Sequence, residues 1–334
     1  MDALINYLTV AGYPFIPGLE SANGWPADVH IIGKDILRFH CIYWPAFLMA
    51  LDLPLPKNIL THAHWTMNKM KMSKSVGNVV SPSFALSRFG IDTMRYYLIH
   101  DGGLNDDSDY SNDMVVERYT KQLQGQLGNL LSRTTAERFK HKACVSHGAG
   151  RSWQEFPNTT VPGAAHSGQE DWKMQQEDLT QLNTLLKIPN EVFSLMKPDQ
   201  YDVPGALKRI MDIIYRTNNY ISHTEPWRLF SLMRSLKVKS ERGGEPFNSE
   251  EFHRLEQEMT KTIFLTGEGL RVAGILLQPF IPGKAEELLS LLGVRQDRRG
   301  IDWLAVGCDA EYGASGEEHH KEKKKLFPPL ESLE

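Results

Sequence analysis

The stretch KMKMSKSVGNVVSP, residues 69–82, is the most informative part of this chain. It places two lysines and two serines in a short loop between apolar segments, namely Lys71, Ser73, Lys74 and Ser75. Ammonium and hydroxyl groups suit a polyphosphate, and Gly77 allows the loop to hinge. One well-placed cation or hydrogen-bond donor that stabilises the charge on a leaving pyrophosphate increases the reaction rate by a factor of roughly 10²–10³. The loop therefore predicts a polyphosphate site, against the simpler alternative of a solvated lysine turn.

The segments that precede this loop have the pattern of an α/β domain. The sequence DVHIIGKDI, residues 28–36, predicts a strand that ends in a glycine turn, and a helix follows over residues 35–49. Pro45 is expected to kink this helix or to restart it. NILTHAHWTM, residues 58–67, predicts a second strand. A strand, a helix and a strand of these lengths fit one crossover of a parallel sheet.

The remainder of the chain is predicted to be helical. Ser81 and Pro82 mark a helix start and Gly90 its end, and a short helix follows from Asp92. Apolar residues at helical spacing predict a helix from about residue 111 to 140, and further helices are expected at 171–197, 203–223, 226–235, 249–277 and 283–292. Residues 141–170 and 236–249 are predicted to be loops. The expected domains are 1–110 (α/β), 111–310 (a helical bundle) and 311–334 (a charged tail).

Composition limits the class of protein without deciding its function. The chain has 334 residues, 41% hydrophobic and 23% charged, as in a soluble globular protein, and is long enough for two domains. A net charge of -4 does not exclude nucleic acid, because a local basic surface matters more than the total. The three cysteines are far apart and predict neither a disulfide framework nor a zinc site. No apolar run reaches the roughly 18 residues of a membrane span, so no membrane partner is expected.

Several weaker candidates lie outside the lysine-rich loop. Gly33, Lys34 and Asp35 stand between a strand and a helix, where open parallel sheets bind nucleotides, although alone they would be an ordinary turn. His40 lies one helical turn after Ile36, and a lone histidine there is more often part of the core. His62 and His64 alternate on a strand, but without a third ligand at sensible spacing they are predicted to be structural.

Four segments together resemble one family of enzymes. DALINYL, HIIGKDILRFH, IYWPAFL and KMSKSVGNVV, in this order, look like the class I aminoacyl-tRNA synthetases for methionine, and most of all like their mitochondrial type. The similarity continues through NLLSR, EPW and LLQPFIP. The resemblance implies the C-terminal half of a Rossmann-like catalytic domain, followed by an α-helical anticodon-binding bundle.

The resemblance also implies roles for individual residues. Those that match the methionine pocket are Tyr7, Ile36 and His40. Those that match the ATP site are Gly33, Lys34, Asp35, Trp44, Ser73, Lys74 and Ser75, with Lys71 and Lys74 as the catalytic lysines. The reaction would be attack of the methionine carboxylate on the α-phosphate of ATP, supplied with Mg²⁺ as a substrate. Methionyl-adenylate would then pass its acyl group to tRNA(Met), and no bound zinc is expected.

The helical half contains a candidate RNA site. Asn129 and Arg133 lie four apart, so they share one helix face. Thr224, Glu225 and Pro226 predict a helix start that would hold Trp227 as a stacking platform. Without the resemblance, the first two would be a surface pair and Trp227 part of the core. In the family, the matching positions recognise the CAU anticodon.

The chain also departs from the family pattern. No HIGH-like first signature is present, and position 1 falls inside what would be the catalytic domain. We therefore expect an N-terminally truncated form that cannot form the adenylate efficiently on its own. The alternatives are a non-catalytic fragment that binds the tRNA anticodon, another class I synthetase of the leucyl or cysteinyl type, and an unrelated helical interaction protein. A monomer in the mitochondrial matrix is expected, with the cytoplasm as the alternative compartment.

Overall fold

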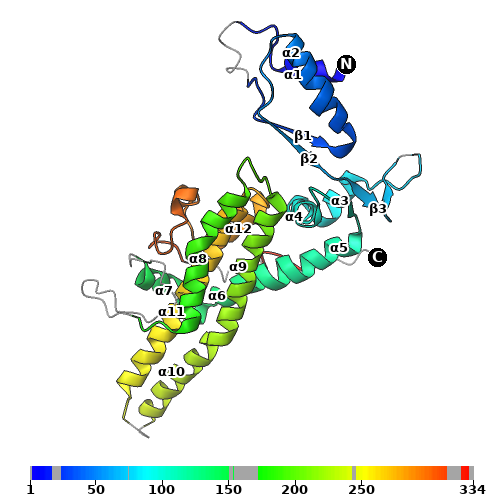
Figure 1. Cartoon of the computed structure of the whole chain (residues 1–334). Helices are drawn as coiled ribbons and strands as arrows, with labels where there is room; N and C mark the ends of the chain where they lie inside the picture. Colours follow the sequence, from blue (N-terminus) through cyan, green and yellow to red (C-terminus); the bar gives the residue numbers. More distant parts are fainter. Residues whose placement is uncertain are drawn as a thin grey trace.

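The computed structural model describes residues 2–16, 24–73, 75–149, 153, 172–242, 246–313 and 325–330. Figure 1 shows a small α/β part, in blue, at one end of the molecule and a larger body of helices at the other. A short sheet and two helices, labelled β3, α3 and α4, lie between them. The architecture is thus α/β followed by a helical bundle, as the sequence predicts.

The first part contains the predicted strand–helix–strand crossover. Strand β1 (Val29–Gly33) pairs in parallel with β2 (Asn58–His62), with Val29 opposite Asn58. Between them the chain forms a 3₁₀ turn (Lys34–Ile36), a wider π-helical turn (Phe39–Tyr43) and α2 (Trp44–Ala50). Pro45 lies in the first turn of α2, directly after the π-helical turn, and Tyr43 and Trp44 keep helical backbone angles, so the helix continues through Pro45 and does not restart. Helix α1 (Asp2–Val10) packs Leu4 and Leu8 against Trp25, Trp44 and Leu48.

The prediction of one strand over residues 58–67 is wrong. The strand stops at His62, because the backbone amides of Ala63 and His64 bond instead to Leu104 O and to the Asp107 carboxylate. The chain then enters a second sheet, in which β3 (Trp65–Met67) lies between β4 (Met70–Lys71) and β5 (Ser108–Asp109). This second sheet carries the lysine-rich loop at the end of β4.

Two helices connect this sheet to the bundle. Helix α3 (Pro82–Phe89) is capped by Ser81, whose hydroxyl accepts a hydrogen bond from Phe84 N, and it ends at Gly90. Gly90 has a φ of 78°, a conformation that favours glycine. Both boundaries are as predicted, and α4 (Ile91–Asp101) begins one residue earlier than expected.

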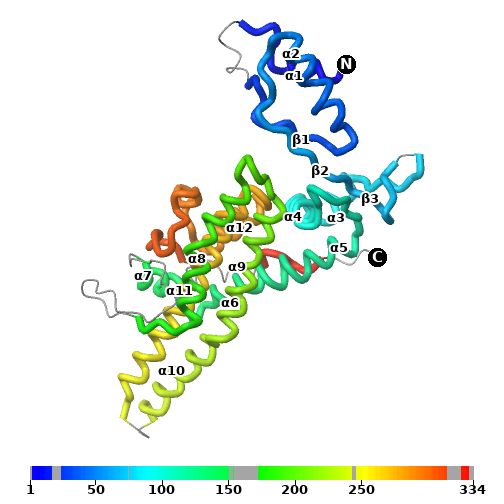
Figure 2. Tube along the Cα trace, viewed as in Figure 1, coloured from blue at the N-terminus to red at the C-terminus, as the bar shows by residue number. Residues whose placement is uncertain are grey.

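The helical body is built around one long helix. Helix α11 (Ser249–Leu277) is buried on every side from Lys261 to Leu277. The helices that make most of the contacts with it are α7 (His141–Gly148), α8 (Gln176–Leu195), α9 (Val203–Thr224), α10 (Pro226–Glu241) and α12 (Pro282–Leu291). Helices α8 and α9 run side by side, and α10 and α11 form a hairpin at the far end of the molecule (Figure 2). The predicted helices 203–223 and 249–277 are therefore confirmed.

One helix and one loop differ from the prediction in their boundaries. The helix expected from residue 111 to 140 is α5 (Asn112–Glu117), a π-helical segment (Arg118–Gly128) and α6 (Asn129–Thr134). It stops early because the chain turns at Ala136, and again at Lys140 with φ 47°, to bury Phe139. The predicted 236–249 loop is wrong up to Glu241, where α10 ends, because Leu236 still packs against the core.

The predicted loop at 141–170 is wrong over its first eight residues, which form α7. His141, Cys144, Val145 and Gly148 recur at helical spacing and are buried. A side chain at Gly148 would come within 2.4 Å of the Phe264 ring of α11, so glycine lets the two helices approach closely. Most of the remaining loop, residues 150–152 and 154–170, lies outside the described residues.

The last described segments pack on the bundle. Short 3₁₀ turns (Gln296–Arg298 and Ile301–Trp303) follow α12. The Tyr312 side chain is buried, and its hydroxyl donates to Glu268. Leu326 and Phe327 are also buried, and Phe327 meets the Tyr119 ring edge-on. Residues 314–324 and 331–334 of the predicted tail lie outside the described residues.

Candidate functional site

A group of charged side chains meets at the carboxyl ends of β1 and β2. Asp35 Oδ1 lies 3.1 Å from His64 Nε2, and its Oδ2 lies 3.4 Å from the Lys71 ammonium. Hydrogen bonding from His64, with a smaller contribution from Lys71, lowers the pKa of the Asp35 carboxyl. The glycine turn predicted to bind a nucleotide is therefore in contact with the first lysine of the KMSKS loop.

Gly33 and Lys34 complete this group. A Cβ at position 33 would lie 2.9 Å from Asp35 Oδ1 and 3.4 Å from His64 Nε2, so glycine leaves room for that pair. Lys34 forms an ion pair with Asp107 at 2.7 Å, and the same carboxylate accepts a hydrogen bond from the backbone N–H of His64. Sequence reasoning missed His64 and Asp107 as members of the site. His64 was considered only as a metal ligand and was predicted to be structural. Asp107 carries no local signal, because the loop before β5 brings it in from far along the chain.

The KMSKS loop is closed by one asparagine. The Asn78 side chain accepts a hydrogen bond from Ser73 N at 2.8 Å and donates one to Lys71 O at 3.2 Å. The hydroxyls of Ser73 and Ser75 lie 2.7 Å apart, on the same turn. Gly77, with a φ of 73°, donates its N–H to Ser73 O. Asn78 was also missed, although an asparagine after a glycine is a common turn signal. Lys74 lies outside the described residues.

Aromatic and imidazole rings form a second group beside α1. The Tyr7 hydroxyl lies 2.9 Å from His40 Nε2, and His40 Nδ1 lies 3.1 Å from the carbonyl oxygen of Ile36. A neutral imidazole that donates from Nδ1 and accepts at Nε2 satisfies both contacts. The structure therefore brings together the three residues that the resemblance assigns to methionine. The Ile36 side chain itself is 38% exposed.

Trp44 and His30 lie behind this group. Trp44 is fully buried, and its indole N–H donates to His30 Nε2 at 3.2 Å. The Tyr7 ring lies against both of them, with its centroid 4.6 Å from that of His30 and 5.8 Å from that of Trp44. Burial, followed by the nearby His40, lowers the pKa of His30. Trp44 thus contacts the aromatic group through Tyr7, and sequence reasoning missed His30.

The third group lies where α6 meets the start of α10. The Arg133 guanidinium lies over the Trp227 indole, 5.0 Å from the ring centroid, and its Nη2 donates to the Ser222 hydroxyl at 3.0 Å. Burial lowers the pKa of Arg133. Pro226 is in the first turn of α10, as the sequence predicts, so Trp227 lies at a helix tip. Asn129 is exposed in the first turn of α6, on the same helix as Arg133.

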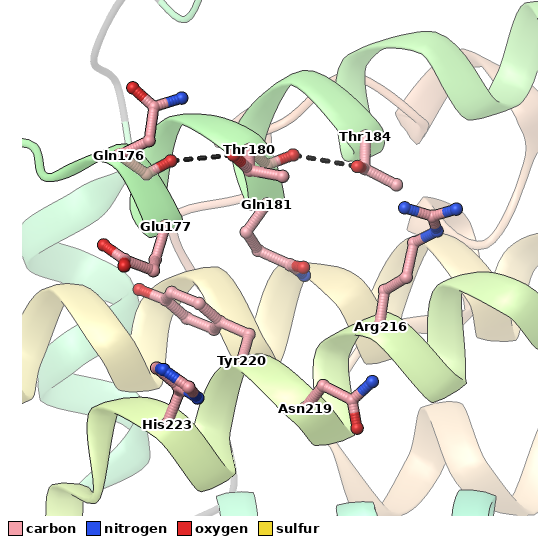
Figure 3. Close-up of a pocket in the computed structure, with 9 residues that line it drawn as sticks. All are labelled: Gln176, Glu177, Thr180, Gln181, Thr184, Arg216, Asn219, Tyr220 and His223. Atoms are coloured by element: carbon pink, nitrogen blue, oxygen red, sulfur yellow. Dashed lines mark hydrogen bonds between the residues drawn. The ribbon is translucent and has the colours of Figure 1, made fainter.

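A separate cavity lies between α8 and α9. Its volume is about 390 Å³, and its lining includes Thr180 and Gln181 from α8 and Arg216, Tyr220 and His223 from α9 (Figure 3). None of the predicted site residues lines it. Within the described ranges, no three histidine, cysteine, aspartate or glutamate side chains are grouped as metal ligands. Over the same ranges, every helix is too short or too polar to cross a bilayer.

Comparison with known proteins relates the chain to one group of synthetases. A family model described as tRNA synthetases class I (M) matches residues 1–135. The probable mitochondrial methionine–tRNA ligase of Neurospora crassa is 46% identical over 331 residues, which cover 98% of this chain and 47% of that protein. The human mitochondrial methionine–tRNA ligase is 35% identical over 307 residues, which cover 91% of this chain and 46% of the human protein.

A solved structure agrees with these relatives. Mycobacterium tuberculosis methionyl-tRNA synthetase, in complex with methionyl-adenylate, superposes with a TM-score of 0.73 at 31% identity. The match covers 98% of this chain and 55% of the mycobacterial one. The chain spans about half the length of the curated relatives that it matches. By sequence and by fold, the chain belongs to the methionyl-tRNA synthetase family of class I.

Proposed function

We propose that this chain provides the KMSKS half of the active site, and the anticodon-binding part, of a mitochondrial methionine–tRNA ligase. The observation that carries the proposal is the contact between Lys71 of the KMSKS loop and Asp35 of the glycine turn. It places cations and a carboxylate at the carboxyl end of parallel strands, where nucleotides bind. The mitochondrial matrix is the proposed compartment, since the relatives named above are mitochondrial ligases.

In the proposed reaction, the methionine carboxylate attacks the α-phosphate of ATP, and pyrophosphate leaves. A new P–O bond forms as the bond to the β-phosphate bridging oxygen breaks. Lys71, Lys74, Ser73 and Ser75 stabilise the charge on the leaving pyrophosphate. Gly33, Lys34 and Asp35 hold the nucleoside, and the ATP carries Mg²⁺ on its phosphates. No proton has to move in this step, so the side chains act by position and charge.

The methionine side chain is assigned to the group of Tyr7, Ile36 and His40. A thioether is apolar and polarisable, and it packs well against aromatic and imidazole edges. Tyr7 and His40 form a hydrogen bond with each other, so these side chains do not need a hydrogen bond from the substrate. Trp44 supports Tyr7 from behind in this proposal.

Methionine-dependent exchange of pyrophosphate into ATP tests the catalytic half of the proposal. Exchange that requires methionine, and that falls at least a hundredfold in Lys71→Ala and Lys74→Ala, would support it. Leucine and cysteine are the matched controls, because exchange with either of them in place of methionine would assign the chain to another synthetase.

A second candidate function is binding of the tRNA without activation of methionine. The observation that favours this candidate is the Arg133 guanidinium over the Trp227 indole, because this contact does not involve the nucleotide site. Its signature would be no exchange with any amino acid, together with a gel shift of tRNA(Met) that Trp227→Ala removes. A chain that neither exchanges pyrophosphate nor shifts tRNA(Met) would contradict both functions.

A further inference from the structure

A cavity between α7, α10 and α11 has a lining unlike that of the other pockets. Its volume is about 350 Å³, within the range of ligand sites. The floor is apolar and buried, and consists of Phe139, Cys144, Met233 and Met259. Burial raises the pKa of the Cys144 thiol to about 11, so this cysteine acts as a small apolar group in the floor.

The rim of the same cavity carries three cations and one carboxylate, beside the polar side chains of His147, His253, Gln257 and Thr260. Arg138, Lys140 and Lys237 line it, and Glu256 is its acidic side chain. Two of these cations already lie over aromatic rings: Arg138 is 4.9 Å from the Phe139 centroid, and Lys237 is 4.8 Å from that of Phe252. An apolar lining that includes Phe139, Phe230 and Phe252, beneath cations, suits a flat ring attached to a negatively charged group. An unstacked nucleotide has this chemistry, because its base stacks on aromatic groups and its phosphates attract lysine and arginine.

The cavity and the Arg133–Trp227 group share one cluster of buried residues, although neither Arg133 nor Trp227 lines the cavity. Trp227 packs against the same cluster of buried residues that forms the floor. Phe230, which lines the cavity, lies three residues after Trp227 on α10, nearly one helical turn. Arg138 follows Arg133 after the turn that ends α6. One strand of RNA held at Trp227 could therefore place its next nucleotide in the cavity.

We propose that this cavity binds one unstacked nucleotide of the tRNA anticodon loop, next to the base held by Arg133 and Trp227. The floor receives the base, and Arg138, Lys140 and Lys237 neutralise the neighbouring phosphates. The proposal rests on the tRNA-binding part of the proposed function. The cavity between α8 and α9 is a weaker candidate, because its one arginine, Arg216, is already paired with Asp212.

The test is the affinity of the 334-residue chain for an anticodon stem–loop RNA of tRNA(Met), measured by fluorescence anisotropy. Phe252→Ala removes a wall of the cavity, and Lys237→Ala removes a cation of the rim. We expect each to weaken binding by roughly tenfold, the scale of one stacked base or one phosphate contact. Lys239→Ala is the matched control, since Lys239 is exposed on the same helix and does not line the cavity.

Abasic RNAs identify the nucleotide that the cavity receives. One loop position should weaken binding to the unmodified chain when its base is removed, and should have no further effect in Phe252→Ala. Equal affinities of Phe252→Ala, Lys237→Ala and Lys239→Ala, with Trp227→Ala still weakened, would overturn the cavity proposal and leave the tRNA function standing. If the unmodified chain does not bind the RNA, both proposals fail.

Discussion

The ammonium of Lys71 lies 3.4 Å from Oδ2 of Asp35, so the KMSKS loop touches the glycine turn of β1 in this structure. Both side chains are well exposed, 71% for Lys71 and 49% for Asp35, and such pairs contribute little to stability. The contact is therefore more important for position than for folding. It keeps a cation of the loop beside the proposed nucleotide site, from which a polyphosphate can attract it.

The first prediction concerns Asp35→Asn. This change removes the carboxylate that His64 and Lys71 share, and we expect roughly tenfold weaker binding of ATP, because the nucleoside loses a charged hydrogen-bond acceptor. The melting temperature should stay nearly constant. Titration calorimetry and thermal unfolding measure the two effects. Asp28→Asn is the control, since Asp28 forms an exposed ion pair with Lys57 away from the glycine turn. Equal losses in the two variants would contradict the assignment.

The parts of the proposed nucleotide site differ in how well the sequence predicts them. The glycine turn and the KMSKS loop are local patterns, and a right-length crossover places the turn at a strand end. His64 and Asp107 join the site only because β3 and β5 pair in parallel, a contact between residues far apart in the chain. Local patterns carry no information on such pairing. For the same reason they predict a strand that continues past His62, where β2 ends.

In the helical half, too, local features are predictable from the sequence and contacts between distant segments are not. Proline in the first turn marks the starts of α3, α10 and α12, and these boundaries are close to the predicted ones. Helix α7 was missed because its apolar positions are few, and its burial depends on a glycine contact with Phe264. The position of Arg133 over Trp227 depends on the packing of α6 near the start of α10, which spacing along one helix cannot show.

The second prediction concerns Trp44→Phe. Trp44 is fully buried, and the change removes both a ring and the N–H that donates to His30 Nε2. A cavity and a lost hydrogen bond in a buried site together cost about 3 kcal/mol. The free energy of unfolding in urea measures this loss, and methionine affinity should fall as Tyr7 loses its support. Trp303→Phe is a suitable control, because Trp303 is only partly buried and lies in the other half of the molecule. A Trp44→Phe variant as stable as this control would refute the supporting role.

The third prediction concerns Glu268→Gln. Glu268 and Arg271 are both fully buried, and Glu268 also accepts hydrogen bonds from Gly307 N and the Tyr312 hydroxyl. Removing one charge leaves Arg271 buried without compensation, which costs about 3–5 kcal/mol. Urea unfolding should show this loss, and proteolysis should begin near Gly307. Glu311→Gln affects ion pairs with Arg295 and Arg298 in which the glutamate itself is 57% exposed, and it should change the stability much less. Similar stabilities of the two variants would argue against the anchoring role.

The fourth prediction concerns the pH dependence of stability at Asp101. Partial burial raises the pKa of this carboxyl, but hydrogen bonds from His100 and Arg118 outweigh it and lower the pKa to about 2. A carboxyl whose folded pKa is depressed stabilises the protein above its unfolded pKa, here 3.8, and this contribution is lost as the pH falls toward 2. Asp101→Asn should therefore be less stable by about 2 kcal/mol at pH 7. Urea unfolding from pH 7 to pH 2 should show the two proteins converging below pH 4. A constant difference down to pH 2 would exclude this ionisation as the cause.

The last prediction concerns the way in which Arg133 meets Trp227. The guanidinium is planar and lies over the indole, while Nη2 donates to Ser222, so its remaining N–H groups keep a fixed direction. Lysine keeps the charge but can neither stack as a plane nor present a fork of donors to a base edge. We therefore expect Arg133→Lys to weaken binding of the CAU stem–loop by roughly tenfold, the lower end of what a bidentate base contact contributes. The slope of affinity against salt should stay the same, because the number of positive charges does not change.

The preference for one anticodon over another separates a role of Arg133 in reading a base from a general loss of RNA affinity. A stem–loop with a changed first anticodon base should bind the unmodified chain weakly, and Arg133→Lys should bind it no worse than before. Arg234→Lys is the control, because it makes the same chemical change at an exposed position of α10. If Arg133→Lys weakens both RNAs equally, or changes the salt slope, then Arg133 contributes charge alone, and base reading must be assigned to Trp227 and its other neighbours.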